Sequence, residues 1–187
     1  MALGLTASDE RDFSSVLWLL VGAFVLHEAE EWNITAFERR NFVDLPPQVT
    51  EENGRAWLVF ICVVAAGWCA AATLPGSPKL AAFVFLPAVG LAVANALQHV
   101  FWAIYFKEYA PGVVSAVLLL LPLAIYVAAR AGLRDLVPLW YLLGLALMIA
   151  VIVGNTVRSR RRMTAPIRAI YAVGAWILRL ARMHSGR

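Results

Sequence analysis

The chain has 187 residues, of which 61% are hydrophobic and 15% are charged, and its mean hydropathy is +0.73. A soluble domain is about half apolar and about a quarter charged, so the composition excludes an ordinary soluble domain and predicts an integral membrane protein. The net charge is +4, but the basic residues are concentrated in the C-terminal tail. This distribution indicates membrane topology and contact with anionic lipid, and no nucleic-acid partner is expected.

The first predicted helix ends in charged residues. Its purely apolar part, from about Val16 to Leu26, is shorter than the ~20 residues that a membrane span requires. The stretch "HEAEEWN" follows directly at residues 27–33. We therefore expect the helix to continue through this stretch toward Phe37. The alternative is a helix that ends near Leu26 and leaves the acidic stretch as a solvated turn at the membrane interface.

Four further apolar segments are long enough to span a bilayer, and short segments rich in Pro, Gly and charge separate them. They are Ala56–Leu74, Leu80–Phe106, Val113–Ala129 and Leu136–Gly154. The expected fold is an all-α integral membrane bundle of five transmembrane helices, which forms one domain over residues 1–157. No internal repeat or second domain is evident.

The orientation follows from the positions of Lys and Arg, which favour the cytoplasmic side of a membrane. If the N-terminus is outside, twelve of the 16 basic residues lie inside, and only Arg11, Lys79, Arg130 and Arg134 lie outside. We therefore expect a multi-pass protein of the cell (inner) membrane with the N-terminus outside and the C-terminus in the cytoplasm.

Residues 158–187 form a basic hinge followed by a predicted amphipathic helix. At 100° per residue, Arg168, Arg179 and Arg182 share one face and aliphatic residues occupy the opposite face. Tyr171 and Trp176 suit the level of the lipid headgroups. We expect this interfacial helix to lie in the membrane plane on anionic lipid. A sixth span is the alternative.

Ionisable residues occur at matching depths in two predicted helices. His27, Glu30 and Glu31 have the i, i+3 and i, i+4 spacings that share one helix face. Glu31 and His99 each lie eight residues from a basic residue expected at the inner surface, which corresponds to roughly 12 Å. Lone charged groups facing lipid cost several kcal/mol, so we expect these four residues to converge in one buried pocket. Alternatively, His99 and Asn95 form only a polar pair between helices.

Two histidines and two glutamates supply nitrogen and oxygen ligands that suit Zn or Fe. The predicted mononuclear metal site uses His27, Glu31 and His99, with Glu30 as a base or supporting group. A di-iron site typically requires four carboxylates and two histidines, so it is disfavoured unless Glu28 joins the ligands. Glu28 points about 100° away from His27 and is expected to be structural or water-facing. The two cysteines lack metal-binding spacing and are expected to pack between helices.

The segment "HEAEE" matches the pattern H-x-x-E-E, a second histidine follows at His99, and "YAPG" occupies residues 109–112. In these three motifs the chain resembles the HXXEE family of small multi-span membrane proteins, from the first helix to about the fourth. The resemblance implies a membrane-embedded enzyme whose activity is not established. It singles out His27, Glu30, Glu31, His99, Tyr109, Pro111 and Gly112.

The YAPG segment also has a physical interpretation of its own. Pro111 and Gly112 are typical of a tight turn, which here connects the third and fourth spans at the inner surface. Tyr109 is expected either to anchor this turn at the membrane interface or to reach inward as a proton donor.

Three functions remain open from the sequence. The first is a metal-dependent membrane enzyme that acts on a lipid or another hydrophobic small molecule, with a pocket that includes Asn95, Trp32, Trp102 and Tyr109. The second is a metal-free acid–base isomerase or cyclase of an isoprenoid or lipid, which needs no cofactor. The third is a carrier or scaffold without catalysis. A homo-oligomer is compatible with all three, and His184 receives no role.

Overall fold

The structure is a computed structural model that describes residues 7–185, with side chains described for residues 13–184. The described part is helical apart from its connections, with one isolated bridge between Val43 and Arg162. Five helices are long and apolar enough to cross a membrane. This finding agrees with the all-α membrane bundle predicted from the sequence.

The first span continues through the charged stretch, as predicted. Helix α1 (Ala7–Glu30) passes through a 3₁₀ turn, η1 (Glu31–Asn33), into α2 (Ile34–Asn41). The apolar span within it runs from Phe13 to Asn41. The alternative in which the helix ends near Leu26 is therefore wrong.

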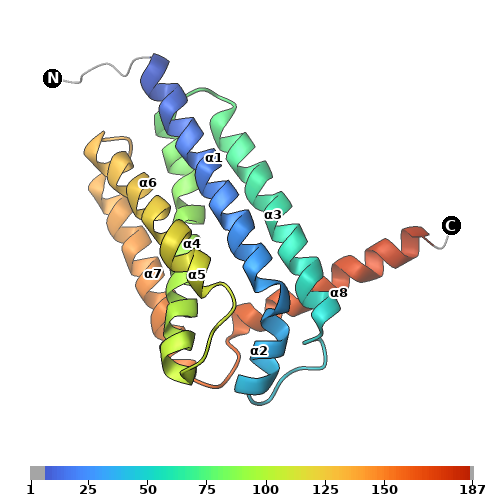
Figure 1. Ribbon diagram of the computed structural model, residues 1–187. Coiled ribbons are helices and arrows are strands. Elements are labelled where there is room, and N and C mark those ends of the chain that lie inside the picture. Colours follow the sequence, from blue (N-terminus) through green and yellow to red (C-terminus); the bar gives the residue numbers. More distant parts are fainter. Residues whose placement is uncertain (1–6, 186–187) are drawn as a thin grey trace.

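The other spans surround a central helix. Helix α4 (Pro78–Phe106) packs against α1, α3 (Glu51–Thr73), α6 (Leu121–Leu133) and α7 (Leu139–Ser159) (Figure 1). It buries several small residues, among them Ala82, Ala92 and Ala96, and small side chains let neighbouring helices approach closely. The remaining spans are α3 (Glu51–Thr73), α4 (Pro78–Phe106), the run of α5 (Val113–Ser115), η2 (Ala116–Leu120) and α6 (Leu121–Leu133), and α7 (Leu139–Ser159).

The fourth span contains a π-helical turn, η2, just before Pro122. Proline has no backbone N–H, and its ring clashes with the carbonyl group four residues earlier in a regular α-helix. A π-helical turn widens the backbone at this point and relieves the clash. The span therefore continues past the proline to Leu133, four residues beyond the predicted end.

Helix α8 (Ala165–Ser185) follows the basic hinge and crosses the bundle beside α3 (Figure 1). It is not among the helices apolar enough to span a membrane, so its in-plane position on lipid stays a prediction. Trp176 is largely exposed, but Tyr171 is buried. The hydroxyl of Tyr171 donates a hydrogen bond to Glu38, so this side chain faces the bundle rather than lipid, and its position at the headgroup level stays a prediction.

The crossing of α8 and α3 depends on a close backbone approach at Gly174. A Cβ atom added to Gly174 would lie 2.0 Å from the carbonyl oxygen of Asn53. We therefore expect Gly174→Ala to lower the free energy of unfolding by about 1–3 kcal/mol, although alanine has the better helix propensity. Denaturant titration of the purified protein in mixed micelles measures this change.

The matched control is Gly144→Ala in α7, where an added Cβ meets no atom within 4 Å. This variant should be neutral or more stable by up to about 1 kcal/mol. Equal stabilities of the two variants would show that α8 does not pack on α3 at this point.

Candidate functional site

Three polar side chains meet near one end of the bundle. His27 lies in the last turn of α1, Glu31 begins the 3₁₀ turn, and His99 comes from α4. The Nε2 atoms of both histidines lie 2.8 Å from the same oxygen, Oε1 of Glu31. All three residues are buried. Potential metal-ligand atoms of the three lie within 4.8 Å of one another.

The helix geometry of the first span places His27 and Glu31 on the face that points toward His99. His27 and Glu31 are four residues apart, so they lie on one face of the first span. That face meets α4 where the small residues Ala92 and Ala96 are buried. The two imidazole rings consequently pack edge to face, with centroids 5.0 Å apart.

The orientation of His27 is held by a hydrogen-bonded chain. Its Nδ1 lies 3.0 Å from Oγ of Ser115, and this hydroxyl donates to Oε2 of Glu30 at 2.5 Å. A carboxylate only accepts hydrogen bonds, so we infer that Nδ1 of His27 carries the proton that reaches Ser115. In the neutral ring, Nε2 then presents a lone pair toward Glu31, where the amide of Asn95 also lies 3.0 Å away.

Glu30 joins the first span to the start of the fourth. Its carboxylate accepts hydrogen bonds from the backbone N–H groups of Val114 at 3.1 Å and Ser115 at 2.7 Å. A carboxylate at a helix N-terminus is favourable because it satisfies free N–H groups and faces the positive end of the helix dipole. The structure therefore connects Glu30 to the cluster only through Ser115, which differs from the predicted convergence of all four residues.

Tyr109 completes the surroundings of Glu30. Its hydroxyl donates to Oε1 of Glu30 at 2.5 Å, and burial together with this carboxylate raises the pKa of Tyr109 to about 12. The side chain is 56% exposed and does not line the cavity described below. Glu30 thus holds the ring of Tyr109 at the surface of the bundle, and the predicted role of Tyr109 in a substrate pocket stays a prediction.

The turn after Tyr109 packs directly on the histidines. The N–H of Val113 donates to the carbonyl of Ala110 at 3.0 Å, and Gly112 has φ +94°, which is the pattern of a type II turn with Pro111 and Gly112 in the centre. A Cβ on Gly112 would lie 2.9 Å from Cε1 of His27. Only glycine suits both the backbone conformation and the space.

The same turn covers the second histidine. A Cβ on Gly112 would lie 3.0 Å from Nδ1 of His99. This nitrogen is buried against the turn and makes no hydrogen bond of good geometry among the described residues. His99 is therefore held by its Nε2 contact with Glu31 and by the packing of Gly112 and Trp102 against its ring.

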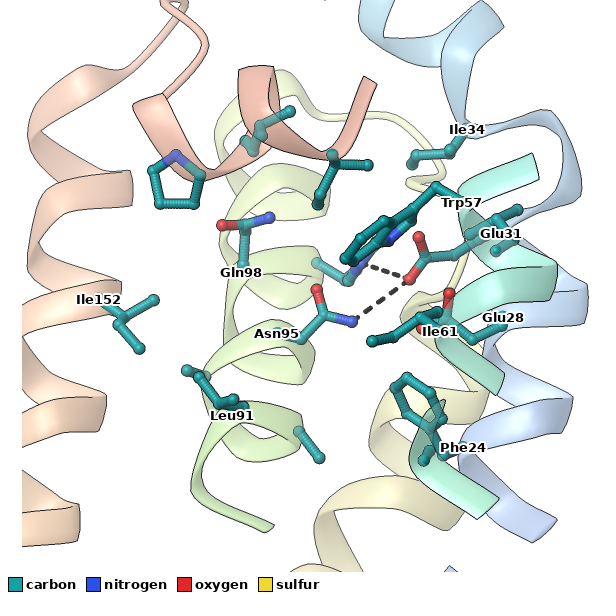
Figure 2. A pocket seen from close by; sticks show the side chains of 18 of the residues that line it. Phe24, Glu28, Glu31, Ile34, Trp57, Ile61, Leu91, Asn95, Gln98 and Ile152 are labelled. Carbon is teal, nitrogen blue, oxygen red and sulfur yellow. Dashed lines mark hydrogen bonds and ion pairs between the residues drawn. The ribbon is translucent and has the colours of Figure 1, made fainter. Parts of the chain in front are cut away.

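A mainly apolar cavity of about 630 Å³ adjoins the cluster. It lies between α3 and α7, with α4 behind it and the start of α8 across one end. Figure 2 shows Glu31 on one side, Ile152 of α7 on the other and Asn95 between them. Trp57 from α3 also lines the cavity. The polar cluster is thus at the wall of a space large enough for a hydrophobic small molecule.

Two of the predicted pocket residues line this cavity and a third does not. Asn95 and Trp102 are lining residues. Trp32 is 46% exposed and packs under the guanidinium of Arg55, 5.3 Å from the ring centroid. Trp32 follows Glu31 directly in the 3₁₀ turn and points to a different side, and its predicted role in a substrate pocket stays a prediction. His184 hydrogen-bonds only to the Leu180 carbonyl within α8.

Sequence reasoning missed three ionisable residues of the cavity. Glu28, expected to be structural or water-facing, is buried and lines the cavity. Its i, i+3 spacing from Glu31 was the available signal, because such residues share a face. Glu38 and Tyr171 also line the cavity. Burial and the Glu38 carboxylate raise the pKa of Tyr171, and no sequence signal pairs residues so far apart.

The family comparison agrees with the motifs. A family model described as "Protein of unknown function with HXXEE motif" matches residues 18–127, which is more than half of the chain. The matched region includes His27, Glu30, Glu31, His99 and the turn at Gly112. No curated protein and no solved structure matches the chain. The chain therefore belongs to the HXXEE-motif family of proteins of unknown function.

Proposed function

We propose that this protein is a membrane-embedded, metal-dependent enzyme that acts on a lipid or another hydrophobic molecule. The observation that carries the proposal is the approach of two imidazole Nε2 atoms to one carboxylate oxygen, each at 2.8 Å, beside an apolar cavity of about 630 Å³. Buried ionisable groups within membrane spans are costly and typically serve a function.

The donor set fits a catalytic metal. Two neutral imidazoles and one carboxylate are the ligands of a common class of zinc sites, and a similar set with open positions binds Fe(II). Tetrahedral ligands at about 2.1 Å from zinc are about 3.4 Å apart. The contacts of Glu31 with His27 and His99, each 2.8 Å, therefore need to lengthen by about 0.6 Å. The chain from His27 through Ser115 to Glu30 suits metal binding, because it leaves Nε2 free as a ligand.

The cavity supports a hydrophobic substrate. Glu31 and His99 line it, so coordination positions not taken by protein would face the substrate. There a metal would polarise a substrate oxygen or lower the pKa of a bound water. The long walls come from α3 and α7, two candidate membrane spans that bring mainly apolar side chains to the cavity. A substrate dissolved in the bilayer would meet this space from the side.

The 2.8 Å contacts also support a second candidate, a metal-free acid–base isomerase or cyclase. They are ordinary hydrogen-bond lengths, so protons rather than a metal would join Glu31 to the two rings. Trp57, Trp68 and Trp102 line the cavity, and their π faces would stabilise a carbocation. No comparable observation favours a carrier or scaffold.

Metal analysis of the wild-type protein separates the two candidates. The protein is purified without chelator, and its metal content is determined by mass spectrometry. We expect about one equivalent of Zn or Fe per chain, which dialysis against a chelator removes. A protein that neither retains nor rebinds metal would exclude the metal-dependent enzyme and leave the acid–base candidate.

The proposed location is the inner membrane, with the N-terminus outside and the C-terminus inside. The end of the bundle that carries Arg39, Arg40, Lys107 and the 158–162 segment would face the cytoplasm. A C-terminal fluorescent-protein fusion should fluoresce, whereas the corresponding alkaline-phosphatase fusion should be inactive. The reverse result would invert the orientation and the side of the membrane on which the cluster lies.

The exposed arginines of α8 are proposed to contact anionic lipid. A peptide of residues 158–182 should bind anionic vesicles more tightly than neutral ones and bind less as salt increases. Salt-insensitive binding to neutral vesicles would contradict this part of the proposal.

A further inference from the structure

Glu28 is a buried carboxylate without a protein partner. Its side chain lines the cavity beside Glu31 (Figure 2), and the residue is only 5% exposed. It makes no hydrogen bond or ion pair with any residue whose side chain the structure describes. A buried polar group without a partner costs free energy, and a buried charge costs more. A hydrogen-bond partner for Glu28, either water or a bound molecule, would therefore come from the cavity that it lines.

The other two carboxylates of the cavity already have donors. Glu31 lies 2.8 Å from Nε2 of His99 and accepts a hydrogen bond from the Asn95 amide. Glu38 accepts a hydrogen bond from Tyr171. No Lys or Arg is among the residues that line the cavity. The described lining thus brings three carboxyl groups and no Lys or Arg side chain to the cavity, so no protein side chain there would pair with an anionic phosphate or carboxylate head group, and only the proposed metal would attract one.

We infer that the cavity binds an apolar molecule that carries a protonated amine, and that the ammonium group pairs with Glu28. An ammonium group supplies three hydrogen-bond donors and one positive charge. No described residue of the protein supplies Glu28 with a donor or a positive charge. The indole face of Trp57, which also lines the cavity, adds a favourable cation–π contact. This inference names the substrate class of the proposed enzyme and rests on the same cavity, but it does not require the metal.

The test compares ligands that share one dodecyl chain and differ only in the head group. The full-length protein is reconstituted in neutral phosphatidylcholine nanodiscs and titrated with dodecyl chains brominated at their end. The head groups are amine, alcohol, carboxylate and phosphate. Bromine quenches nearby tryptophans, and Trp57, Trp68 and Trp102 line the cavity. Displacement by unbrominated dodecylamine separates binding in the cavity from partition into the bilayer.

We expect the amine to bind at least about tenfold more tightly than the alcohol, and both anions to bind more weakly still. Glu28→Gln should remove the preference for the amine over the alcohol. The matched control Glu52→Gln alters an exposed glutamate of α3 outside the cavity and should retain the preference. Metal content is measured in the same samples and should be unchanged in Glu28→Gln.

Several results would overturn the inference. One is equal binding of amine and alcohol by the wild-type protein, which would indicate that Glu28 instead serves a neutral donor such as a metal-bound water. Tight binding of either anion is another, and so is an amine preference that survives in Glu28→Gln. If Glu28→Gln does not fold, the selectivity of the wild-type protein alone decides. A protein that binds the amine but no metal would refute the metal-dependent enzyme and leave this inference standing.

Discussion

Replacing His99 with alanine should remove most of the bound metal from the purified protein. His99 supplies one of the two imidazoles that face Glu31, at 2.8 Å. Even a supporting residue behind a metal ligand typically changes affinity by 10–100-fold, so the loss of a ligand should weaken binding by at least about 100-fold. His27→Ala should have a similar effect. Metal content after purification without chelator and competitive titration with a metal-binding dye measure both variants.

The matched control is His184→Ala. This histidine is exposed in α8 and bonds only to the carbonyl of Leu180, so its loss should leave the metal content unchanged. Circular dichroism and gel filtration establish that each variant remains folded. Folded His27→Ala and His99→Ala proteins that retain full metal content would show that the cluster is not the metal site.

Gly112→Ala should both destabilise the protein and disturb the cluster. The positive φ of +94° at Gly112 costs an alanine about 1–2 kcal/mol. The added Cβ would also lie 2.9–3.0 Å from atoms of His27, Glu31 and His99, and overpacking of this kind costs about 1–3 kcal/mol. We expect the free energy of unfolding to fall by about 2–5 kcal/mol, together with a loss of bound metal.

Gly76→Ala separates these two contributions. Gly76 also has a positive φ, +70°, but a Cβ there meets no atom within 4 Å. This variant should lose only the backbone contribution of about 1–2 kcal/mol and keep its metal. If the two variants are equally stable and both retain metal, the turn at Gly112 does not press on the histidines. Denaturant titration in mixed micelles and metal analysis provide both measurements.

The membrane spans could be predicted from local sequence. In lipid every backbone N–H and C=O group must be hydrogen-bonded within the protein, so an apolar segment of sufficient length forms a helix along its whole length. The apolar part before His27 was too short to cross a bilayer, so continuation through "HEAEEWN" was the expected solution. The approach of Glu31 and His99 followed from their equal depth and the cost of facing lipid. The rise of 1.5 Å per residue in a helix gives the depth of each of these side chains from its sequence position. Both expectations could therefore be made without knowing which helices are neighbours.

The roles of the neighbouring glutamates depended on the tertiary structure. Glu30 looked like a member of the cluster, but its carboxylate binds the N–H groups that begin α5. Glu28 was expected to be structural or water-facing. In the structure it lines the cavity, because α3 and α7 enclose that side of the first span. The pattern H-x-x-E-E thus fixes the spacing of the side chains, whereas the helices packed on each side decide what each carboxylate meets.

The same distinction applies to the aromatic residues. Sequence by itself determined a bundle of membrane-length helices with Glu31 and His99 at one level, because depth and helix periodicity are local properties. Only the packing decided that Trp32 lies outside the cavity and that Tyr171 lies inside the bundle. Tyr171 meets Thr35 and Glu38 from the far end of the chain. Such contacts depend on the crossing of α8 and α3, which the close approach at Gly174 permits.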